Sequence, residues 1–400
     1  MLKSVLIVVE NLPAPFDRRA WREAITLRKA GYRVSILSPK GKDYTAWHEI
    51  IDGIHVYRYP MPFEAKTMWG YFIEYPWSLS WEFFIALWLK LFGPGFDAIH
   101  LCDPPDFLFL VALPFKIFGT KMVFDHHDLS PELFVVKFGH KGFWYKVLLW
   151  FERMSYRFCD VAISPNQSYK EIAITRNRMN PDRVFVVRSA PSQARLTGIE
   201  PLRDHLFSGK KLVGYVGVIG SQEGLDLLVD AVHHLVFSMK KTDVMFLVMG
   251  EGPALEDVKA YAREKRVLGK HMRFLGYVPD KEMLPTLAAC HVAVNPDRVN
   301  EFSDRSTMNK VIEYMALGVP VVMFETTEGK FSAGDAALYA KPNDPVDLAE
   351  KIAWLLDHPE QAKKMGETGK RRFSDQLKWE KSEPNLLRAY RALFQVNKGG

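Results

Sequence analysis

The sequence has few cysteines, and this excludes two classes of protein. Cys102, Cys159 and Cys290 are the only three in 400 residues, and they lie far apart along the chain. Three scattered thiols build neither a disulfide framework nor a four-thiolate zinc site. We therefore expect a protein of a reducing compartment, with the cytoplasm as the default location.

The sequence also lacks a secretory leader and a long apolar run. Residues 1–10 are apolar over only a few positions, with no small-residue cleavage site after them, so they predict a first strand rather than a signal peptide. The most aromatic stretch, residues 68–92, is interrupted by Glu74, Pro76, Glu82 and Lys90. Because a bilayer span needs about 20 consecutive apolar residues, we expect no transmembrane helix.

Dense clusters of Lys and Arg are absent as well. The net charge is +6, and residues 1–190 supply most of it, with 24 basic against 19 acidic side chains, a net +5. Residues 191–400 have 29 basic and 28 acidic side chains, a net +1. A nucleic-acid partner is therefore not expected, because such proteins concentrate their positive charge around a recognisable binding motif.

Aromatic residues are abundant and unevenly placed. Residues 68–92 contain ten of them, including four tryptophans, and residues 141–153 mix aromatics with Lys and Arg. Trp and Tyr favour the membrane interface, so one interpretation is a first domain that rests on the inner membrane surface as a peripheral protein. The other interpretation is that these are packed helices of a large core. The sequence leaves both open.

Short runs rich in Val, Ile and Leu alternate with helical patterns along the whole chain, which predicts an α/β fold with parallel sheets. The clearest helix covers Arg19–Ala30 and is closed by Gly31. The predicted strands are Val5–Glu10, Arg33–Ser38, His55–Tyr59, Ala98–Cys102, Lys121–Asp125, Val161–Ser164, Val184–Arg188, Leu212–Val218, Val244–Met249, Met272–Gly276, Val292–Asn295, Val319–Phe324 and Ala337–Tyr339.

The length of 400 residues favours two domains, and the periodicity fails once, from Ser189 to Lys211. We predict a Rossmann-like domain over 1–190, a linker over 191–211 and a second Rossmann-like domain over 212–375. Residues 376–400 are predicted to form a helix that returns to the first domain. Open parallel sheets bind ligands at the carboxyl ends of their strands, so we expect both sheets to face a central cleft.

The first strand is not followed by a dinucleotide fingerprint, which argues against a hydride-transfer enzyme. In the second half, a glycine-rich segment from Gly214 through Gly217, Gly220 and Ser221 to Gly224 follows a strand and opens a helix. Backbone amides at such a helix start favour a phosphate group. Tight packing of the turn is the alternative explanation for these glycines.

The segment from Ser306 to Val322, STMNKVIEYMALGVPVV, closely resembles the donor-binding helix and strand of retaining, nucleotide-sugar-dependent glycosyltransferases of family four. Other matching segments are residues 16–24, 29–34, 250–253 and 274–279. The resemblance implies the GT-B architecture of two Rossmann-like domains, with the acceptor held by the first and the nucleotide sugar by the second. It implies no obligatory metal and no bound cofactor, since the nucleoside-diphosphate sugar is a co-substrate.

The resemblance also implies a set of site residues. Glu313 matches the glutamate that binds the donor ribose, and Lys310 would offer a point charge to the diphosphate. The acceptor side is predicted to include Asp17, Arg18 and Arg19. The predicted donor-binding residues are Asp304, Arg305, Ser306, Thr307, Met308, Asn309, Lys310, Glu313, Gly217, Gly220, Ser221, Arg188, Gly250, Gly252 and Tyr277.

Several positions depart from the family pattern. The usual second glutamate is Arg305 here, so either neighbouring Asp304 replaces it or the donor sugar is bound differently. The usual arginine and lysine of the glycine loop are Val218 and Glu223. Another cation must then neutralise the diphosphate, and the candidates are Lys310, Arg305, Arg188 and the Arg18–Arg19 pair.

The segment Asp125-His126-His127-Asp128 follows a predicted strand of the first domain. A metal site is disfavoured because adjacent histidines point apart and no further cluster completes one. In the family, a histidine at this place contacts the donor sugar near the reacting carbon. The predicted catalytic residues are His127, then His126, with Asp128 beside them. Capping of the turn is the alternative role.

The leading prediction is a hexosyltransferase that adds a sugar to a growing bacterial surface polysaccharide on a polyprenyl-diphosphate carrier. A second hypothesis keeps the chemistry but uses a soluble sugar acceptor. A third is a non-catalytic scaffold that binds a nucleotide sugar in a polysaccharide assembly complex. The nucleobase, sugar, linkage and oligomeric state are not predicted.

Overall fold

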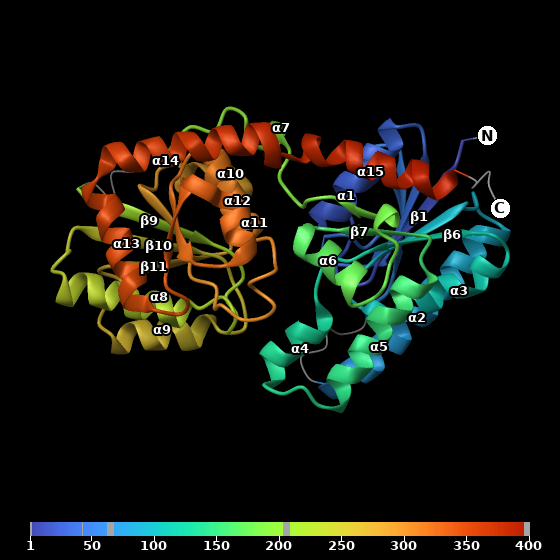
Figure 1. Cartoon of the computed structure of the whole chain (residues 1–400), viewed down its shortest axis with the longest axis horizontal. Helices are drawn as coiled ribbons and strands as arrows, with labels where there is room; N and C mark the ends of the chain where they lie inside the picture. The colour runs from blue at the N-terminus through green and yellow to red at the C-terminus, as the bar shows by residue number, and fades with distance from the viewer. Residues whose placement is uncertain (1, 42, 62–67, 203–208, 396–400) are drawn as a thin grey trace. The chain divides into compact units, whose positions relative to one another are not determined.

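The computed structural model describes residues 2–41, 43–61, 68–202 and 209–395. The chain divides into two units (Figure 1). One runs through Arg188 and resumes at Ser382, and the other covers Ser189–Lys381. Each unit is a largely parallel sheet covered by helices on both faces, which confirms the predicted fold class of two Rossmann-like α/β domains.

The sheet of the first unit has the strand order β3-β4-β2-β1-β5-β6-β7-β8. Its neighbours pair in parallel except for β3, which pairs antiparallel with β4 at the edge. The prediction missed β3 because this edge strand is short and only half-buried. The strands are β1 Ser4–Val9, β2 Arg33–Pro39, β3 His48–Ile51, β4 Ile54–Tyr59, β5 Ala98–Cys102, β6 Lys121–Asp125, β7 Val161–Ser164 and β8 Val184–Val186.

Helix α1 begins where Asp17 accepts hydrogen bonds from the backbone amides of Arg19 and Ala20, and it ends before Gly31. Two short 3₁₀ turns, Asp106–Leu108 and Pro181–Arg183, precede α3 and β8. The helices that pack in this unit are α1 Arg18–Lys29, α2 Met68–Leu91, α3 Phe109–Ile117, α4 Ser130–Phe138, α5 Phe143–Phe158, α6 Gln167–Thr175 and, from Ser382 onward, α15 Trp379–Phe394.

Alternation along the central strands gives this sheet two different faces. Leu101 of β5 and Phe124 of β6 join the apolar core beneath α2, α3 and α5. His100, the residue before Leu101 on β5, points to the opposite face of the sheet. There its Nδ1 lies 2.8 Å from the Tyr390 hydroxyl of α15. Because successive side chains of a strand face opposite sides, a buried polar layer forms between the sheet and the pair α1 and α15.

The sheet of the second unit is wholly parallel, with the order β11-β10-β9-β12-β13-β14. Its strands are β9 Lys211–Val216, β10 Val244–Met249, β11 Met272–Gly276, β12 Val292–Asn295, β13 Val321–Phe324 and β14 Ala337–Ala340. Its helices are α7 Gln193–Leu196, α8 Leu225–His233, α9 Leu255–Glu264, α10 Asp280–Ala288, α11 Asn309–Leu317, α12 Thr327–Ala333, α13 Pro345–Asp357 and α14 Pro359–Arg372, with short 3₁₀ or π turns at Gly334–Ala336, His234–Ser238 and Phe373–Leu377.

The predicted linker is partly built into the second unit. Ala190 and Leu196 are buried in the core formed by α10 and α11, so the segment around α7 packs against the second unit. Residues 203–208 of that prediction lie outside the described residues. At the other end, Asn385 Nδ2 of α15 donates to Val186 O of the first unit, 2.8 Å away.

Most of the aromatic stretch of residues 68–92 forms the single helix α2, which has a packed side and an exposed side; the membrane interpretation remains a prediction. Ile85 and Leu89 are buried in the core, whereas Phe84 is 63% exposed and Trp88 45%. Within the parts of the chain that the structure describes, no helix combines the length and apolar character needed to cross a bilayer.

Glu10, the residue after β1, is a buried carboxyl group whose pKa affects the stability of the fold. Burial raises its pKa to about 7, and nearby Glu74 adds to the rise while a hydrogen bond with Ser78 opposes it. The folded state therefore keeps a proton that the unfolded chain loses near its ordinary pKa, and stability falls as pH rises from about 4.5 to 7.

We expect Glu10→Gln to stabilise the protein relative to wild type by about 3 kcal/mol at pH 8 and hardly at all at pH 4.5. Gln resembles the protonated acid and cannot ionise. Urea unfolding at the two pH values measures the difference, with Glu171→Gln on an exposed helix position as the control. Equal effects of E10Q at both pH values would contradict the buried, raised pKa.

Candidate functional site

In the second unit, Lys310 lies beside the glycine loop. It is the second residue of α11, and its Nζ is 2.6 Å from Asp297 Oδ1 and 4.9 Å from the centre of the Tyr215 ring. A Cβ placed on Gly217 would be only 3.5 Å from Lys310 Cε. The structure thus brings a positive charge to the end of β9, and Asp297 holds that charge in place.

The glycines of two loops are explained by close backbone contact. Gly250 follows β10 with φ +139°, and a Cβ there would lie 1.8 Å from Gly217 O. A Cβ on Gly252 would lie 2.4 Å from Ile219 O. Only glycine fits at these two positions, so packing of the loops accounts for both residues. Their predicted donor contacts remain predictions.

The Gly220 amide, predicted to bind phosphate, is engaged by a side chain. Gly220 N donates a hydrogen bond to Glu223 Oε2 at 3.0 Å. Burial raises the pKa of Glu223, while the charge of Lys310 opposes the rise. An anion at this amide would therefore have to displace the Glu223 carboxyl group. Neighbouring Ser221 is exposed.

Glu313 has a partner that the sequence analysis missed. Arg195 Nη1 lies 2.5 Å from Glu313 Oε1, and Arg195 Nε lies 2.8 Å from Asp280 Oδ2. Arg195 comes from α7, within the predicted linker, and Asp280 begins α10. No motif joins three positions so far apart in the chain, so the contact follows only from the tertiary structure.

The loop before α11 contains most of the other predicted donor residues. Asp304 is already engaged, because its Oδ1 accepts from Thr327 N at 2.8 Å and its Oδ2 from Thr327 Oγ1 at 3.0 Å. Ser306 Oγ donates to Phe302 O. Arg305, Thr307 and Met308 are half-buried, Asn309 is exposed, and Tyr277 is 68% exposed on the loop after β11.

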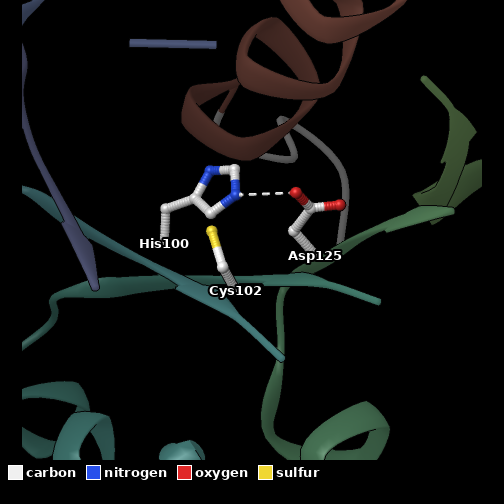
Figure 2. A group of neighbouring side chains, drawn as sticks. All are labelled: His100, Cys102 and Asp125. Atoms are coloured by element: carbon white, nitrogen blue, oxygen red, sulfur yellow. Dashed lines mark ion pairs between the residues drawn. The ribbon is translucent and has the colours of Figure 1, made fainter. Parts of the chain in front are cut away.

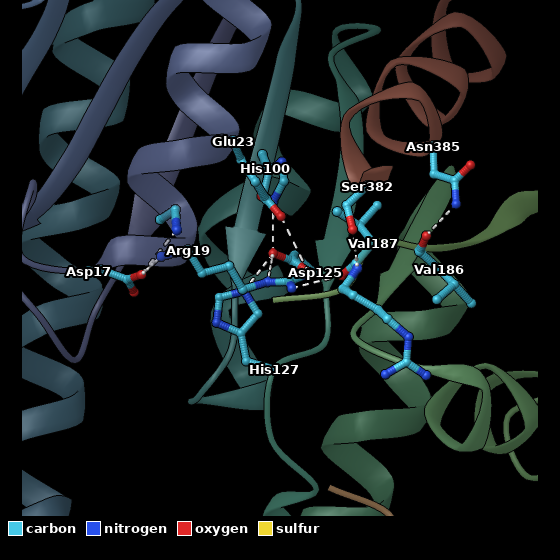
Figure 3. Close-up of polar contacts among 12 residues, drawn as sticks. Asp17, Arg19, Glu23, His100, Asp125, His127, Val186, Val187, Ser382 and Asn385 are labelled. Carbon is cyan, nitrogen blue, oxygen red and sulfur yellow. Dashed lines mark hydrogen bonds and ion pairs between the residues drawn. The ribbon is translucent and has the colours of Figure 1, made fainter. Parts of the chain in front are cut away.

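In the first unit, a buried ion pair joins α1 to β6 (Figure 3). Arg19 Nη2 donates to Asp125 Oδ1 at 2.7 Å and Nε to Oδ2 at 3.1 Å, while Nη1 donates to Val187 O at 2.8 Å. Burial opposes ionisation of Asp125, but the charges of Arg19 and His127 hold its pKa well below the usual range. Asp125 is therefore a carboxylate at neutral pH.

The same carboxylate orients His127. His127 Nε2 lies 2.5 Å from Asp125 Oδ2, and since a carboxylate only accepts, Nε2 carries the hydrogen. The His127 backbone amide donates to Asp103 Oδ1. The other ring nitrogen, Nδ1, is left for a further hydrogen bond, and the side chain is 15% exposed. The structure thus supports a fixed, partly accessible histidine at this position.

A second layer of polar groups lies behind Asp125. His100 Nε2 is 3.3 Å from Glu23 Oε2 and 3.5 Å from Asp125 Oδ2. Burial, with the nearby Asp125 charge, raises the pKa of Glu23 well above its ordinary value, and burial lowers that of His100. Burial thus favours the neutral form of both groups beside the Arg19–Asp125 ion pair, although Arg19 Nη2 lies 3.4 Å from Glu23 Oε1 and opposes this for Glu23.

Among the described residues of this unit, two groups of side chains have ligand atoms close enough to hold a metal. One is His100, Cys102 and Asp125, shown in Figure 2, and the other is Asp103, Asp106 and His126. In the first group, burial raises the pKa of the Cys102 thiol well above its ordinary value. A protonated thiol and a carboxylate already paired with a guanidinium are poor ligands for a cation.

Two predictions for the first unit need correction. His126 is fully buried, its Nδ1 bonds the Tyr156 hydroxyl at 2.7 Å, and burial, with Arg176 and His127, lowers its pKa to about 3. This contradicts substrate contact by His126. Arg19 is also buried with all three guanidinium nitrogens bonded, so it positions Asp125 instead of touching an acceptor.

The remaining predicted residues of this unit lie near the same end of the sheet. Asp17 is the N-cap of α1, and Arg18 beside it is exposed. Burial raises the pKa of Asp128, which follows His127. Arg188 is nearly buried, with its backbone amide donating to Ser382 Oγ at 3.1 Å. Substrate contacts of Asp17, Arg18, Asp128 and Arg188 remain predictions.

Two family models match adjoining parts of the chain. The one described as Glycosyltransferase Family 4 matches residues 17–190, and the one described as Glycosyl transferases group 1 matches residues 210–358. The first begins at the N-cap of α1 and ends after β8. The second contains the glycine loop, Lys310 and Glu313. Together the two matches include both sites described above.

Curated proteins match over part of their length. The chain is 29% identical over 183 residues to the uncharacterized glycosyltransferase MJ1178 of Methanocaldococcus jannaschii, which is 45% of this chain and 47% of that protein. It is 25% identical over 168 residues, 41% of each chain, to the D-rhamnosyltransferase WbpZ of Pseudomonas aeruginosa. The chain thus spans about half the length of the curated relatives it matches.

Solved structures match over nearly the whole chain. A sucrose-phosphate synthase from Thermosynechococcus elongatus has a TM-score of 0.77 at 18% identity, covering 98% of this chain and 99% of that one. Anabaena Alr3699/HepE, solved in complex with UDP-glucose, has a TM-score of 0.70 at 14% identity, covering 98% and 100%. At these identities the likeness concerns the fold.

We expect Asp125→Asn to lower the free energy of unfolding by about 3–5 kcal/mol, because it leaves the buried Arg19 guanidinium without a counter-charge. Urea unfolding measures the loss, with exposed Asp182→Asn as the control. Adding Arg19→Met to D125N should recover part of the stability by removing the unpaired charge. A loss for D125N no larger than that for D182N would contradict the role of this ion pair.

Proposed function

The chain belongs to the group 1 glycosyltransferases of family 4, a retaining and typically metal-independent family, and from this we propose the reaction that it catalyses. It transfers a hexosyl group, with retention at the anomeric carbon, from a nucleoside-diphosphate sugar to a lipid-linked or polysaccharide acceptor of cell-surface glycan synthesis. The observation on which the proposal depends is Lys310 beside the glycine loop of β9.

Lys310 is the proposed partner of the donor diphosphate. Val218 and Glu223 occupy the loop positions where the family usually has its basic pair, so the charge must come from elsewhere. Lys310 lies against Gly217 and is held by Asp297 Oδ1 at 2.6 Å. A preorganised cation at the leaving group stabilises the negative charge that develops as the sugar–phosphate bond breaks.

Glu313 is the proposed ribose ligand, and Arg195 is its proposed positioning residue. A carboxylate accepts hydrogen bonds from two vicinal hydroxyls, which suits a ribose. The 2.5 Å contact with Arg195 Nη1 restrains the Glu313 side chain beside the proposed ribose position. Arg195 itself is restrained by Asp280, so the orientation of Glu313 depends on three elements.

His127 is the proposed contact to the donor sugar near the reacting carbon. Its Nε2–H is bound to Asp125, which leaves Nδ1 as the hydrogen-bonding group for a sugar hydroxyl. The family route is a same-face displacement that needs no enzyme nucleophile. In that route the protein clamps the donor, stabilises the leaving diphosphate and places the acceptor hydroxyl.

We propose UDP-glucose as the first donor to test, because a protein of the same fold was solved in complex with it. The proposal also includes a lipid-linked acceptor and a peripheral position on the cytoplasmic face of the cell membrane. Their support is the exposed aromatic surface of α2, where Trp77, Phe84 and Trp88 are unburied. A soluble sugar acceptor is the competing assignment.

A non-catalytic role as a nucleotide-sugar-binding scaffold is favoured by one observation. Glu223 occupies the Gly220 amide and adds negative charge where the donor diphosphate would lie. Titration with UDP-, GDP- and dTDP-sugars, together with an assay for donor hydrolysis and transfer, separates the two functions. Turnover of any donor supports the enzyme. Saturable binding without turnover for every donor and acceptor supports the scaffold and contradicts our proposal.

We expect Lys310→Ala to weaken binding of the nucleotide sugar that serves as donor at least tenfold, because the diphosphate loses its cation. This is a loss of about 1.4 kcal/mol in binding free energy. Lys330→Ala in the same unit, an exposed lysine paired with Glu325, is the matched control and should leave affinity unchanged. Isothermal titration measures both. The assignment of Lys310 is contradicted if K310A binds the donor as tightly as K330A does.

A further inference from the structure

Helix α5 presents an exposed stripe in which aromatic and basic residues alternate. Phe143, Lys146, Trp150, Arg153 and Arg157 follow one another at intervals of three and four residues, so they share one face of the helix. All five are exposed, Phe143 by 70% and Trp150 by 53%. The opposite face is buried through Glu152, Ser155 and Tyr156. The stripe is therefore a solvent-facing feature of a helix that is otherwise packed.

The basic end of this stripe borders a cavity of about 480 Å³. Arg153 and Arg157 line it from α5, and Arg178 lines it from the turn after α6. Among the residues that the structure describes, none is found within ion-pair or hydrogen-bond distance of these three side chains. Arg176 in the same cavity differs, because Glu132 and Glu152 both bind it. Three unpaired guanidinium groups thus face one cavity and suit an anion.

Apolar stripes on the neighbouring helices extend this face. Helix α3 contacts both α2 and α5, and the three lie together in Figure 1. The outward residues of α2 recur at helical spacing and are all exposed hydrophobics. They are Ile73, Trp77, Phe84, Trp88 and Leu91. Leu110 and Ile117 continue the pattern on α3. Exposed apolar area of this extent, bordered by cations, is typical of an interaction surface.

We propose that the face formed by α2, α3 and α5 docks on an anionic phospholipid bilayer, and that the cavity of Arg153, Arg157 and Arg178 takes the phosphate of a lipid headgroup. Charge complementarity and the aromatic residues select this partner. Trp, Phe and Leu side chains enter the interface of a bilayer, and Lys and Arg beside them bind its anionic lipids. Arg binds phosphate through paired N–H donors, and three guanidinium groups around one cavity present such pairs in several orientations.

This inference deepens the membrane association suggested under the proposed function and rests on it for the source of the phosphate. It assigns the association to defined side chains outside both candidate sites of the transferase. None of the three arginines is among the ion-pair or hydrogen-bond partners of Asp125 and His127, the site residues of the same unit. Catalysis and membrane binding are therefore separable by mutation.

The test is sedimentation of the full chain with vesicles of phosphatidylcholine alone or mixed with phosphatidylglycerol. Each basic residue near an anionic surface is worth roughly fivefold in partitioning, so Arg153→Gln, Arg157→Gln and Arg178→Gln together should reduce binding to the mixed vesicles by at least tenfold. The matched control is Arg263→Gln, Arg266→Gln and Lys270→Gln, three exposed basic residues of the second unit. It should change binding less than twofold.

Added salt should weaken wild-type binding, and Phe143→Ser with Trp150→Ser should weaken it further without altering the salt dependence. Three results would overturn the proposal: binding of the arginine variant to mixed vesicles that equals wild type, an equal loss in the control variant, or arginine-dependent binding of inorganic phosphate with no vesicle binding. The last result would assign the cavity to a free phosphate group. Donor hydrolysis measured on the same variants should be unchanged, so failure of the transferase proposal is seen separately.

Discussion

The bidentate ion pair between Arg19 and Asp125 is the interaction on which the first unit depends most. It crosses from α1 to the carboxyl end of β6, and Arg19 also donates to Val187 O, directly after β8. Because both charges are buried, neither is hydrated. The pair is therefore stable only with its full set of hydrogen bonds. Asp125 remains a carboxylate, and its Oδ2 also accepts from His127 Nε2. A structural ion pair thereby fixes the ring of His127, which is 15% exposed, whereas the neighbouring His100 and His126 are buried.

The alternation of strand side chains explains why this polar layer and the aromatic surface coexist in one domain. β5 and β6 send Leu101 and Phe124 to one face and His100 and Asp125 to the other. The polar face is closed by α1 and α15, so residues from the C-terminal end of the chain complete a site begun by residues near the N-terminus. The apolar face is covered by α2, α3 and α5. Some hydrophobic and aromatic side chains of these helices are buried in the core, and others are exposed on the outer surface.

The parts of the structure that depend on local pattern could be predicted from the sequence. Apolar runs located the central strands to within two or three residues, and Gly31 marked the end of α1. Contacts between distant segments could not be predicted. Arg195 with Glu313, Glu223 with the Gly220 amide and the burial of His126 under Tyr156 follow from tertiary packing alone. The edge strand β3 was missed for a different reason, since a short half-buried strand has little apolar pattern.

The state of the His127 ring tests the central claim of this account most directly. If Asp125 fixes the ring, nitrogen-15 NMR of the histidine-labelled protein should show a protonated Nε2 on His127, with one-bond coupling to its hydrogen, and this signal should be lost or shifted in a folded variant that lacks the Asp125 carboxylate. A neutral His127 with the hydrogen on Nδ1 instead, or a ring whose signals do not respond to removal of that carboxylate, would contradict the account.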